Sequence, residues 1–405
     1  MTDRKALLVI FLTIFIDLLG FGIIIPLLPD YSFKILHIDE SVIGLLVGIY
    51  SLMQFIFTPV WGSLSDIYGR KPILVMSLAG NVISYILMFL VFSGVFPSVY
   101  LLALSRAFAG IFSANLSAAQ AVISDITPPE DRSKGMGILG AAFGLGFVFG
   151  PAMGGILSQH FGYGLPIAMS GIFSLIALTL ALTILKESLP EDIRKQNKRD
   201  FKGVTIVNLR GVRDVLSNKK VGVYVIIFFF ITFSFANIYG TFLLFAERTD
   251  TLSLNQQEVG FLLSFLGIIG AIVQATLIKT FKAKIGEERS ILLGNFLVIF
   301  GLALIPFAPG VPALLVVMTV LGFGNGLNNP MLMGLISTSV SRDEQGSVLG
   351  INQSLGSLAR FLGPVWGGFI YKFGYTFPFL SGGFFMLLIT LFSLKYLKKS
   401  QVSAR

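Results

Sequence analysis

The sequence predicts an all-α polytopic membrane protein with twelve transmembrane helices, arranged as two six-helix halves related by a pseudo-two-fold repeat. Three observations lead to this fold class. The 405 residues are 54% hydrophobic and only 13% charged, whereas soluble proteins carry about 25% charged residues. Apolar stretches long enough to cross a bilayer recur along the chain. Short sequence blocks also recur about 210 residues apart.

Dividing the chain at charges and at Gly/Pro clusters, with about 17–25 residues per span, gives twelve spans. The first six lie near 6–28, 41–64, 73–94, 99–123, 135–157 and 164–185. The second six lie near 221–245, 259–278, 290–308, 313–339, 346–370 and 375–394. The first apolar run is too long for a signal peptide and contains Asp17, so it is expected to remain as a span.

The distribution of Lys and Arg orients these spans. With the N-terminus inside, 25 of the 30 basic residues fall on the inner side. Lys34, Arg248 and Lys372 fall outside, while Arg106 and Arg360 lie within spans. This asymmetry predicts that both termini are cytoplasmic, in an integral protein of the bacterial inner membrane. The excess of basic residues on the inner side, where the lipid is anionic, thus explains the net charge of +9. No nucleic-acid partner is needed to explain it.

The repeat divides the chain into two halves. GPAMGG (150–155) recurs as GPVWGG (363–368), and FGYGLP (161–166) recurs as FGYTFP (373–378). The predicted halves are 1–185 and 221–405, joined by a cytoplasmic linker over 186–220. Two parallel six-helix repeats are typical of transporters that bind substrate near the bilayer midplane. Within the linker, a surface helix and a disordered segment are both open; the apolar residues that would form the helix are Val204, Ile206, Val207, Val212, Val215 and Leu216.

Several function classes are excluded by composition. The chain has no Cys and only two His, His37 and His160, so thiol chemistry and a His or Cys metal site are excluded. No Ser-His-Asp grouping, paired carboxylates or Walker loop is present, so an enzyme is not expected. Without an ATP site or cofactor, transport would draw on an ion or solute gradient, most simply a proton gradient.

The loop between spans 2 and 3 reads GSLSDIYGRKP, residues 62–72. Gly62 and Gly69 permit close packing and a turn, Asp66 can accept helix N-terminal N–H groups, and Arg70 is a bidentate donor. The loop resembles the signature G-x-L-x-D-x-x-G-R-[KR] of the major facilitator superfamily. An ordinary charged loop that satisfies the positive-inside rule is the alternative.

The resemblance implies a conformational lock. Asp66 would cap the start of span 11 near Gly346, and Arg70 would pair with Asp125 at the inner end of span 4. The lock would stabilise the outward-facing state. The equivalent loop of the second half, KTFKAKIGEERS (279–290), is degenerate, and no lock is assigned to it.

Two charged residues are predicted inside the spans of the first half. Asp17 lies near the midplane, and Arg106 lies about 10 Å below the outer interface. A charge at such depth costs a few kcal/mol, so neither is expected to face lipid. We expect a pair or a water-bridged neighbourhood; the alternative is that Arg106 reaches outward and Asp17 bonds an Asn such as Asn115. The resemblance implies proton coupling here, with Asp17 the sole acid within the predicted spans.

Span 5 contains GLGFVFGPAMGG, residues 144–155. Gly146, Gly150 and Gly154 recur every four residues, Pro151 bends the helix, and Gly155 follows. The segment resembles the motif G-x-x-x-G-P-x-x-G-G that is associated with antiporter branches of the superfamily. Helix packing alone is the alternative explanation.

The whole chain resembles tetracycline-efflux proteins of the drug:proton antiporter family. The similar segments are DLLGFGIIIPLLP (17–29), YSLMQFIFTPVWG (50–62), AAFGLGFVFGPAMGG (141–155) and LLGNF (292–296). The resemblance carries over Asp17, Gln54, Asp66, Arg70 and Arg106. Three positions depart from it: Ser84 stands where the family has an acid, Gly270 or a neighbour stands in place of a histidine, and a second acid of the family falls near Val298, in an apolar run. A more apolar pocket is therefore expected.

Uncharged polar side chains in spans that commonly face the cavity are candidates for substrate binding. They are Gln54, Asn115, Gln120, Asn237, Tyr239, Gln274, Asn325, Asn328, Asn329 and Gln353, to which Arg360 in span 11 adds a charge. The 39 Phe residues could offer aromatic surface to amphipathic substrates. The alternative is that Asn side chains join helices and that Phe faces lipid.

Three functions remain open from the sequence. The first is proton-coupled efflux of hydrophobic or amphipathic drugs by a monomer, through rocker-switch alternating access. The second is transport of a native metabolite such as a lysolipid or sugar, by symport, antiport or facilitated diffusion. The third is a non-transporting receptor or scaffold, which would need neither the loop motif nor midplane polar groups.

Overall fold

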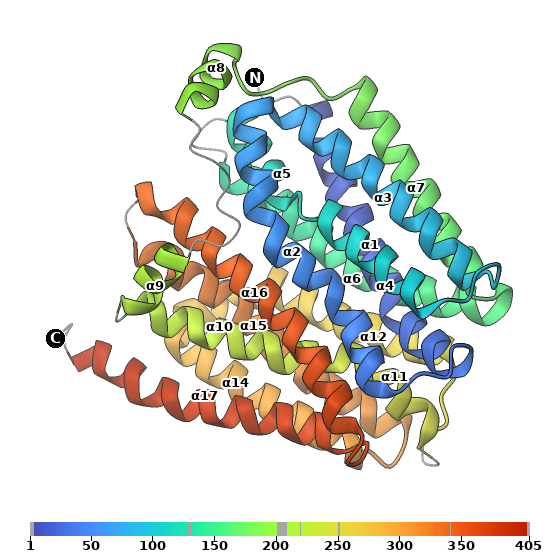
Figure 1. The fold of residues 1–405 in the computed structure, drawn as a ribbon. Coiled ribbons are helices and arrows are strands. Elements are labelled where there is room, and N and C mark those ends of the chain that lie inside the picture. Colours follow the sequence, from blue (N-terminus) through green and yellow to red (C-terminus); the bar gives the residue numbers. More distant parts are fainter. Residues whose placement is uncertain are drawn as a thin grey trace. The chain divides into compact units, whose positions relative to one another are not determined.

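The computed structural model describes residues 4–127, 132–200, 209–218, 220–249, 252–340 and 342–402, and within them every regular element is helical (Figure 1). The first-half helices are α1 (Arg4–Lys34), α2 (Glu40–Tyr68), α3 (Arg70–Phe92), α4 (Val99–Phe112), α5 (Leu116–Ile126), α6 (Arg132–Phe161) and α7 (Gly164–Thr183). After α8 (Glu191–Asp200) and α9 (Leu209–Ser217) come α10 (Val221–Ala236), α11 (Ile238–Arg248), α12 (Gln256–Ile272), the π-helical segment η2 (Val273–Leu277) and α13 (Ile278–Ile285). The chain continues through α14 (Glu287–Leu304), the 3₁₀ turn η3 (Ile305–Phe307), α15 (Val311–Thr338), α16 (Arg342–Tyr371) and α17 (Phe377–Val402).

Eleven helical segments within the described residues are long and apolar enough to cross a membrane. The polar α16, with 30 residues, is also long enough to do so. The helices are therefore consistent with the predicted twelve spans. The first span is longer than predicted, because α1 runs through Pro26 and Pro29 to Lys34 rather than ending near residue 28.

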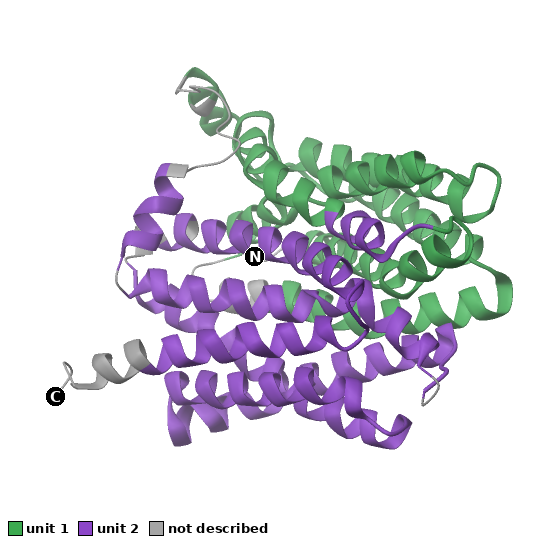
Figure 2. Ribbon diagram, turned by 60° about the horizontal axis from the view of Figure 1, so that its bottom comes forward, with its two compact units in different colours: residues 1–37, 49–207 green, residues 38–48, 208–405 purple. Residues whose placement is uncertain are grey.

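The chain forms two compact units, coloured separately in Figure 2. Unit 1 contains Met1–His37 and Ile49–Val207, and unit 2 contains Ile38–Gly48 and Asn208–Arg405. The division after Val207 falls inside the predicted linker 186–220. The repeat blocks did not predict that the first turns of α2 would belong to unit 2.

Two short helices occupy the described part of the linker. Helix α8 is polar apart from Ile193, whereas α9 is amphipathic and packs against α10 and α16 with Val215 buried. The linker is thus helical over Val212, Val215 and Leu216, and the location of this helix on the membrane surface stays a prediction. Val204, Ile206 and Val207 lie outside the described residues.

The glycine stripe of α6 packs directly against α1 in unit 1. A Cβ at Gly150 would lie 2.7 Å from the Cα of Gly22, and one at Gly146 would lie 2.6 Å from the Cβ of Leu18. Gly154 meets the backbone of Ile23 in the same way. Only glycine permits such a close approach of two helices, so the stripe fixes the position of the helix that carries Asp17.

The N-terminal start of α2 packs with equal closeness within unit 2. A Cβ at Gly44 would collide with the Pro364 carbonyl of α16, and one at Gly48 would lie 2.8 Å from the carbonyl oxygen of Phe361. Beside these glycines, an Arg248 Nη1 atom lies 2.6 Å from Glu40 Oε1. Glycine contacts and an ion pair together hold this end of α2, which we call the α2 seam.

Candidate functional site

The Asp17 carboxylate is buried in unit 1, with 6% of the residue exposed. Its Oδ1 accepts a hydrogen bond from Asn81 Nδ2 at 2.6 Å, and its Oδ2 accepts one from Asn115 Nδ2 at 2.9 Å. The three side chains come from α1, α3 and the turn between α4 and α5. Each carboxylate oxygen therefore has a neutral amide donor.

A break in the predicted fourth span positions Asn115. Instead of one continuous helix over 99–123, α4 ends at Phe112 and α5 begins at Leu116. The break frees backbone carbonyls, which need donors in the membrane. Trp61 Nε1 donates to the Ile111 carbonyl at 2.6 Å, and the Ser77 hydroxyl donates to that of Phe112. Side chains from α2 and α3 thus stabilise the turn that directs Asn115 to Asp17.

Further hydrogen bonds connect Asp17 with the neighbourhood of Arg106. Ser113 Oγ donates to Asn81 Oδ1 at 3.2 Å, and Gln54 Nε2 donates to the Ser113 carbonyl at 3.2 Å and to the Tyr50 hydroxyl at 3.1 Å. The Arg106 guanidinium lies over the Tyr50 ring, 4.8 Å from its centroid. We call this set the Asp17 cluster: Asp17, Tyr50, Gln54, Ser77, Asn81, Arg106, Ser113 and Asn115.

The sequence favoured a direct pair or a water-bridged neighbourhood of Asp17 and Arg106, and of these the direct ion pair is not among the contacts of Asp17. Among the described residues, the hydrogen-bond partners of Asp17 are Asn81 and Asn115, which matches the alternative reading for the acid. Sequence reasoning missed Asn81, one turn before Ser84. The sequence did contain a signal for Asn81, because a carboxamide in an otherwise apolar span needs a polar partner.

Helix α1 carries a second buried acid near its C-terminal end, two residues beyond the predicted span 6–28, in which Asp17 stays the one acid. Asp30 is fully buried. Its Oδ2 accepts from the Tyr163 hydroxyl at 2.5 Å, and Lys34 Nζ lies 2.6 Å from its Oδ1. Asp30 lies about 20 Å along α1 from Asp17. Unlike Asp17, it has a cationic partner.

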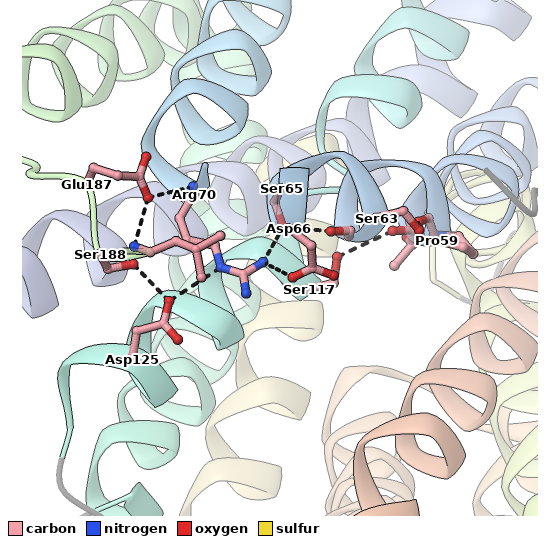
Figure 3. A network of polar contacts seen from close by, with 12 residues as sticks. Pro59, Ser63, Ser65, Asp66, Arg70, Ser117, Asp125, Glu187 and Ser188 are labelled. Atoms are coloured by element: carbon pink, nitrogen blue, oxygen red, sulfur yellow. Dashed lines mark hydrogen bonds and ion pairs between the residues drawn. The ribbon is translucent and has the colours of Figure 1, made fainter. Parts of the chain in front are cut away.

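The junction of α2 and α3 forms the polar network shown in Figure 3. The predicted loop is helical except at Gly69, because α2 runs to Tyr68 and α3 begins at Arg70. Arg70 Nη1 lies 2.6 Å from Asp66 Oδ1, and Arg70 Nε lies 3.4 Å from Asp125 Oδ2. The contact between Arg70 and Asp125 that the motif predicts is therefore present. Gly62, in α2, packs closely on Ser117, since a Cβ on Gly62 would lie 3.2 Å from the Ser117 hydroxyl oxygen. The surroundings of Gly346 fall outside the described residues, and capping by Asp66 there stays a prediction.

Two residues at the start of the linker complete this network and were missed. Glu187 accepts from the backbone N–H groups of Arg70 at 2.9 Å and Lys71 at 3.2 Å, so it caps the N-terminus of α3. Ser188 Oγ donates to Asp125 Oδ2 at 2.9 Å (Figure 3). The signal for a distant cap is Gly69 at the N-cap position, since glycine has no side chain to cap the helix.

Replacing Gly69 by alanine is expected to destabilise the protein more than the same change at Gly94. Both glycines have positive φ, 107° and 79°, so both variants incur backbone strain of about 1–2 kcal/mol. Only the Gly69 Cβ would also collide with the Glu187 carboxylate, while nothing lies within 4 Å at Gly94. Thermal unfolding in detergent measures the difference. Equal losses in both variants would show that the Glu187 cap adds no stability.

The predicted cavity residues have different surroundings. Gln54 and Asn115 belong to the Asp17 cluster. Asn237 donates to the Pro378 carbonyl at 2.6 Å, and Asn328 donates to Asn295 Oδ1 at 3.1 Å. Both Asn residues are buried between helices. These two amides join helices, as the alternative reading held. Gln120 is exposed, as is Gln274 in the π-helical segment η2, whereas the remaining candidates are half-buried: Tyr239, Asn325, Asn329, Gln353 and Arg360.

Ser84, Gly270 and Val298, which the sequence predicts to replace charged or histidine side chains, are used in packing. Ser84 is buried and donates to the Gly80 carbonyl of its own helix at 2.8 Å. Val298 is fully buried in α14. The Gly270 carbonyl lies 3.0 Å from where a Cβ on Gly326 would stand. These positions contribute no charge.

Comparison with known proteins assigns the family. The sequence profile of the Major Facilitator Superfamily matches residues 10–284 and 282–404, which together span nearly the whole chain. The chain belongs to the major facilitator superfamily. It is therefore an integral membrane transporter, and the fold expected from the signature loop is confirmed.

Curated relatives of this transporter include resistance proteins. It is 32% identical over 370 residues to the class C tetracycline resistance protein of Escherichia coli, covering 90% of this chain and 89% of that protein. It is 30% identical over 393 residues to Multidrug resistance protein 2 of Bacillus subtilis (strain 168), covering 95% and 94%.

Solved structures show the same fold. The human organic anion transporter MFSD10 matches with a TM-score of 0.71 at 22% identity, covering 96% of this chain and 99% of that chain. The nucleoside transporter NupG matches with a TM-score of 0.76 at 15% identity, covering 98% and 100%. At these identities the likeness concerns the fold.

Proposed function

We propose that this transporter exports amphipathic small molecules, drugs among them, in exchange for protons. The observation that carries the proposal is the buried Asp17 carboxylate with one Asn amide on each oxygen. An Asn side chain offers both a donor and an acceptor. Asn81 and Asn115 can therefore hydrogen-bond the carboxylate and, after rotation of an amide, the protonated acid. A site that serves both forms is what a proton carrier requires.

The remaining cluster gives substrate a route to influence the acid. Arg106 and Asp17 lie in one polar cluster, linked through Tyr50, Gln54, Ser113 and Asn81. A substrate that brings additional hydrogen-bond donors to this cluster stabilises the charged Asp17 carboxylate and so favours release of its proton. Protonation of Asp17 from the outside would then follow release of substrate.

Alternating access would supply the transport cycle. The network of Asp66, Arg70, Asp125 and Glu187 is the proposed lock, which would break when the inner side opens. The Lys and Arg distribution supports cytoplasmic termini and a bacterial inner membrane. The names of the relatives, tetracycline and multidrug resistance proteins, support an efflux role. The uncharged packing at Ser84, Gly270 and Val298 favours apolar or amphipathic substrates.

Proton release on binding tests this proposal. Calorimetric titration of purified transporter with amphipathic drugs, in buffers of different ionisation enthalpy, is expected to show release of about one proton per bound molecule. Asp17→Asn is expected to bind without release. Binding only by lysolipids or sugars would favour the alternative of a metabolite transporter. Drug binding without any proton release in the wild type would contradict proton exchange.

A further inference from the structure

A polar stripe runs along one face of α16 in unit 2. Gln353, Ser357 and Arg360 are spaced i, i+4 and i+7, so they share that face. Ser357 Oγ donates to the Gln353 carbonyl at 3.2 Å, and Arg360 Nη2 donates to Ser357 Oγ at 2.9 Å. The stripe thus ends in a guanidinium whose orientation is fixed by a neighbouring hydroxyl.

The guanidinium lies deep in the span and does not reach for the nearer membrane boundary. Arg360 is eleven residues before Tyr371, where α16 ends, or about 16 Å along the helix. Its hydrogen bond to Ser357 turns the guanidinium away from that end. A charge held at this depth costs several kcal/mol and is by default a functional group. The observed orientation argues against the outward-reaching alternative for this residue.

Aromatic side chains from α10 and α11 lie beside the stripe. Tyr239 lies within electrostatic range of the Arg360 guanidinium, and its ring contacts that of Phe235, 6.1 Å between centroids. A Cβ at Gly356 would lie 2.8 Å from Cε1 of Phe228, so the glycine lets α10 approach the stripe closely. Phe235, Tyr239 and Arg360 are each half-buried, so part of each remains accessible.

We propose that Gln353, Ser357 and Arg360, with the aromatic side chains Phe235 and Tyr239, form a subsite for the anionic group of an amphipathic substrate. A guanidinium offers five N–H donors in a planar fork that fits a carboxylate, sulfonate or phosphate. The adjoining aromatic rings would hold the apolar body of the same molecule. The sequence places no Asp or Glu in residues 346–371 or 221–246, so these parts of α10, α11 and α16 bring no carboxylate that would repel an anion.

This inference rests on the proposed export of amphipathic molecules and narrows them to those with one anionic group. The test is equilibrium binding of a fluorescent aromatic carboxylic acid and of its methyl ester, two probes that share a body and differ in charge. The wild type is expected to bind the acid at least about tenfold more tightly than the ester, as hydrogen bonds to a charged group provide. Arg360→Gln is expected to reduce this ratio to about one, and Arg360→Lys to retain part of it.

Lys372→Gln is the matched control, because Lys372 is exposed just beyond the same helix and its loss changes the net charge equally. It is expected to keep the wild-type ratio. Unchanged ester binding shows that the Arg360→Gln variant is folded. The inference is overturned if Arg360→Gln keeps the wild-type ratio, or if the wild type binds the acid no better than the ester. Proton release from Asp17 is measured separately, so its absence would contradict proton exchange and leave the charge preference intact.

Discussion

Asp17→Asn is expected to abolish transport driven by a pH gradient, reducing it to the level of empty liposomes. The substitution keeps the size and the hydrogen-bonding capacity of the side chain, and the Asn81 and Asn115 amides can rotate to bond it. What is lost is the ability to take up and release a proton. Exchange of labelled for unlabelled substrate across the membrane needs no net proton movement, and we expect it to continue.

Asp30→Asn is the matched control in the same proteoliposomes. Asp30 is a second buried acid on α1, but it is paired with Lys34 and bonded by Tyr163. Gradient-driven transport should therefore continue in this variant. Loss of coupling in Asp30→Asn with full coupling in Asp17→Asn would move the proton site to the C-terminal end of α1 and refute the assignment.

Gly150→Leu is expected to prevent α6 from packing on α1. Even a Cβ at this position would lie 2.7 Å from the Gly22 Cα, and backbone atoms cannot move aside as a flexible side chain can. Overpacking usually costs about 1–3 kcal/mol and sometimes more. A leucine against backbone belongs at the upper end, so we expect aggregation or a large fall in the thermal unfolding temperature.

Gly144→Leu provides the comparison, since Gly144 lies on the same helix and has nothing within 4 Å of its ideal Cβ. Its unfolding temperature and size-exclusion profile should match those of the wild type. If both variants behaved alike, the close approach of α1 and α6 would not be important for stability. The glycine motif would then need a role other than packing.

The spans could be predicted because the bilayer satisfies no backbone group, which forces long apolar helices. Their ends were less certain. Pro26 and Pro29 suggested an early end to the first span, yet α1 continues to Lys34 because proline removes few hydrogen bonds near a helix end and neighbouring helices support it. The missed extension is what buries Asp30.

The partners of Asp17 were harder to predict. Asn115 was named as a partner, but its direction depends on the break over residues 113–115, which contain no Gly or Pro. That break is held by Trp61 and Ser77, distant in sequence, so local pattern does not reveal it. Glu187 was missed for the same reason, because a cap supplied from more than 100 residues away leaves little local trace.

The α2 seam leaves this part of unit 2 little freedom to vary. Where Gly44 and Gly48 meet backbone carbonyls of α16, a Cβ would lie within 3 Å of a carbonyl oxygen. No side-chain rotamer can relieve such a contact, and a separation of about 0.5–1 Å already loses a quarter to a half of its short-range attraction. Any side chain at these two positions would therefore displace α16. Arg360 lies one turn from Pro364, so the same displacement would move the proposed anion subsite.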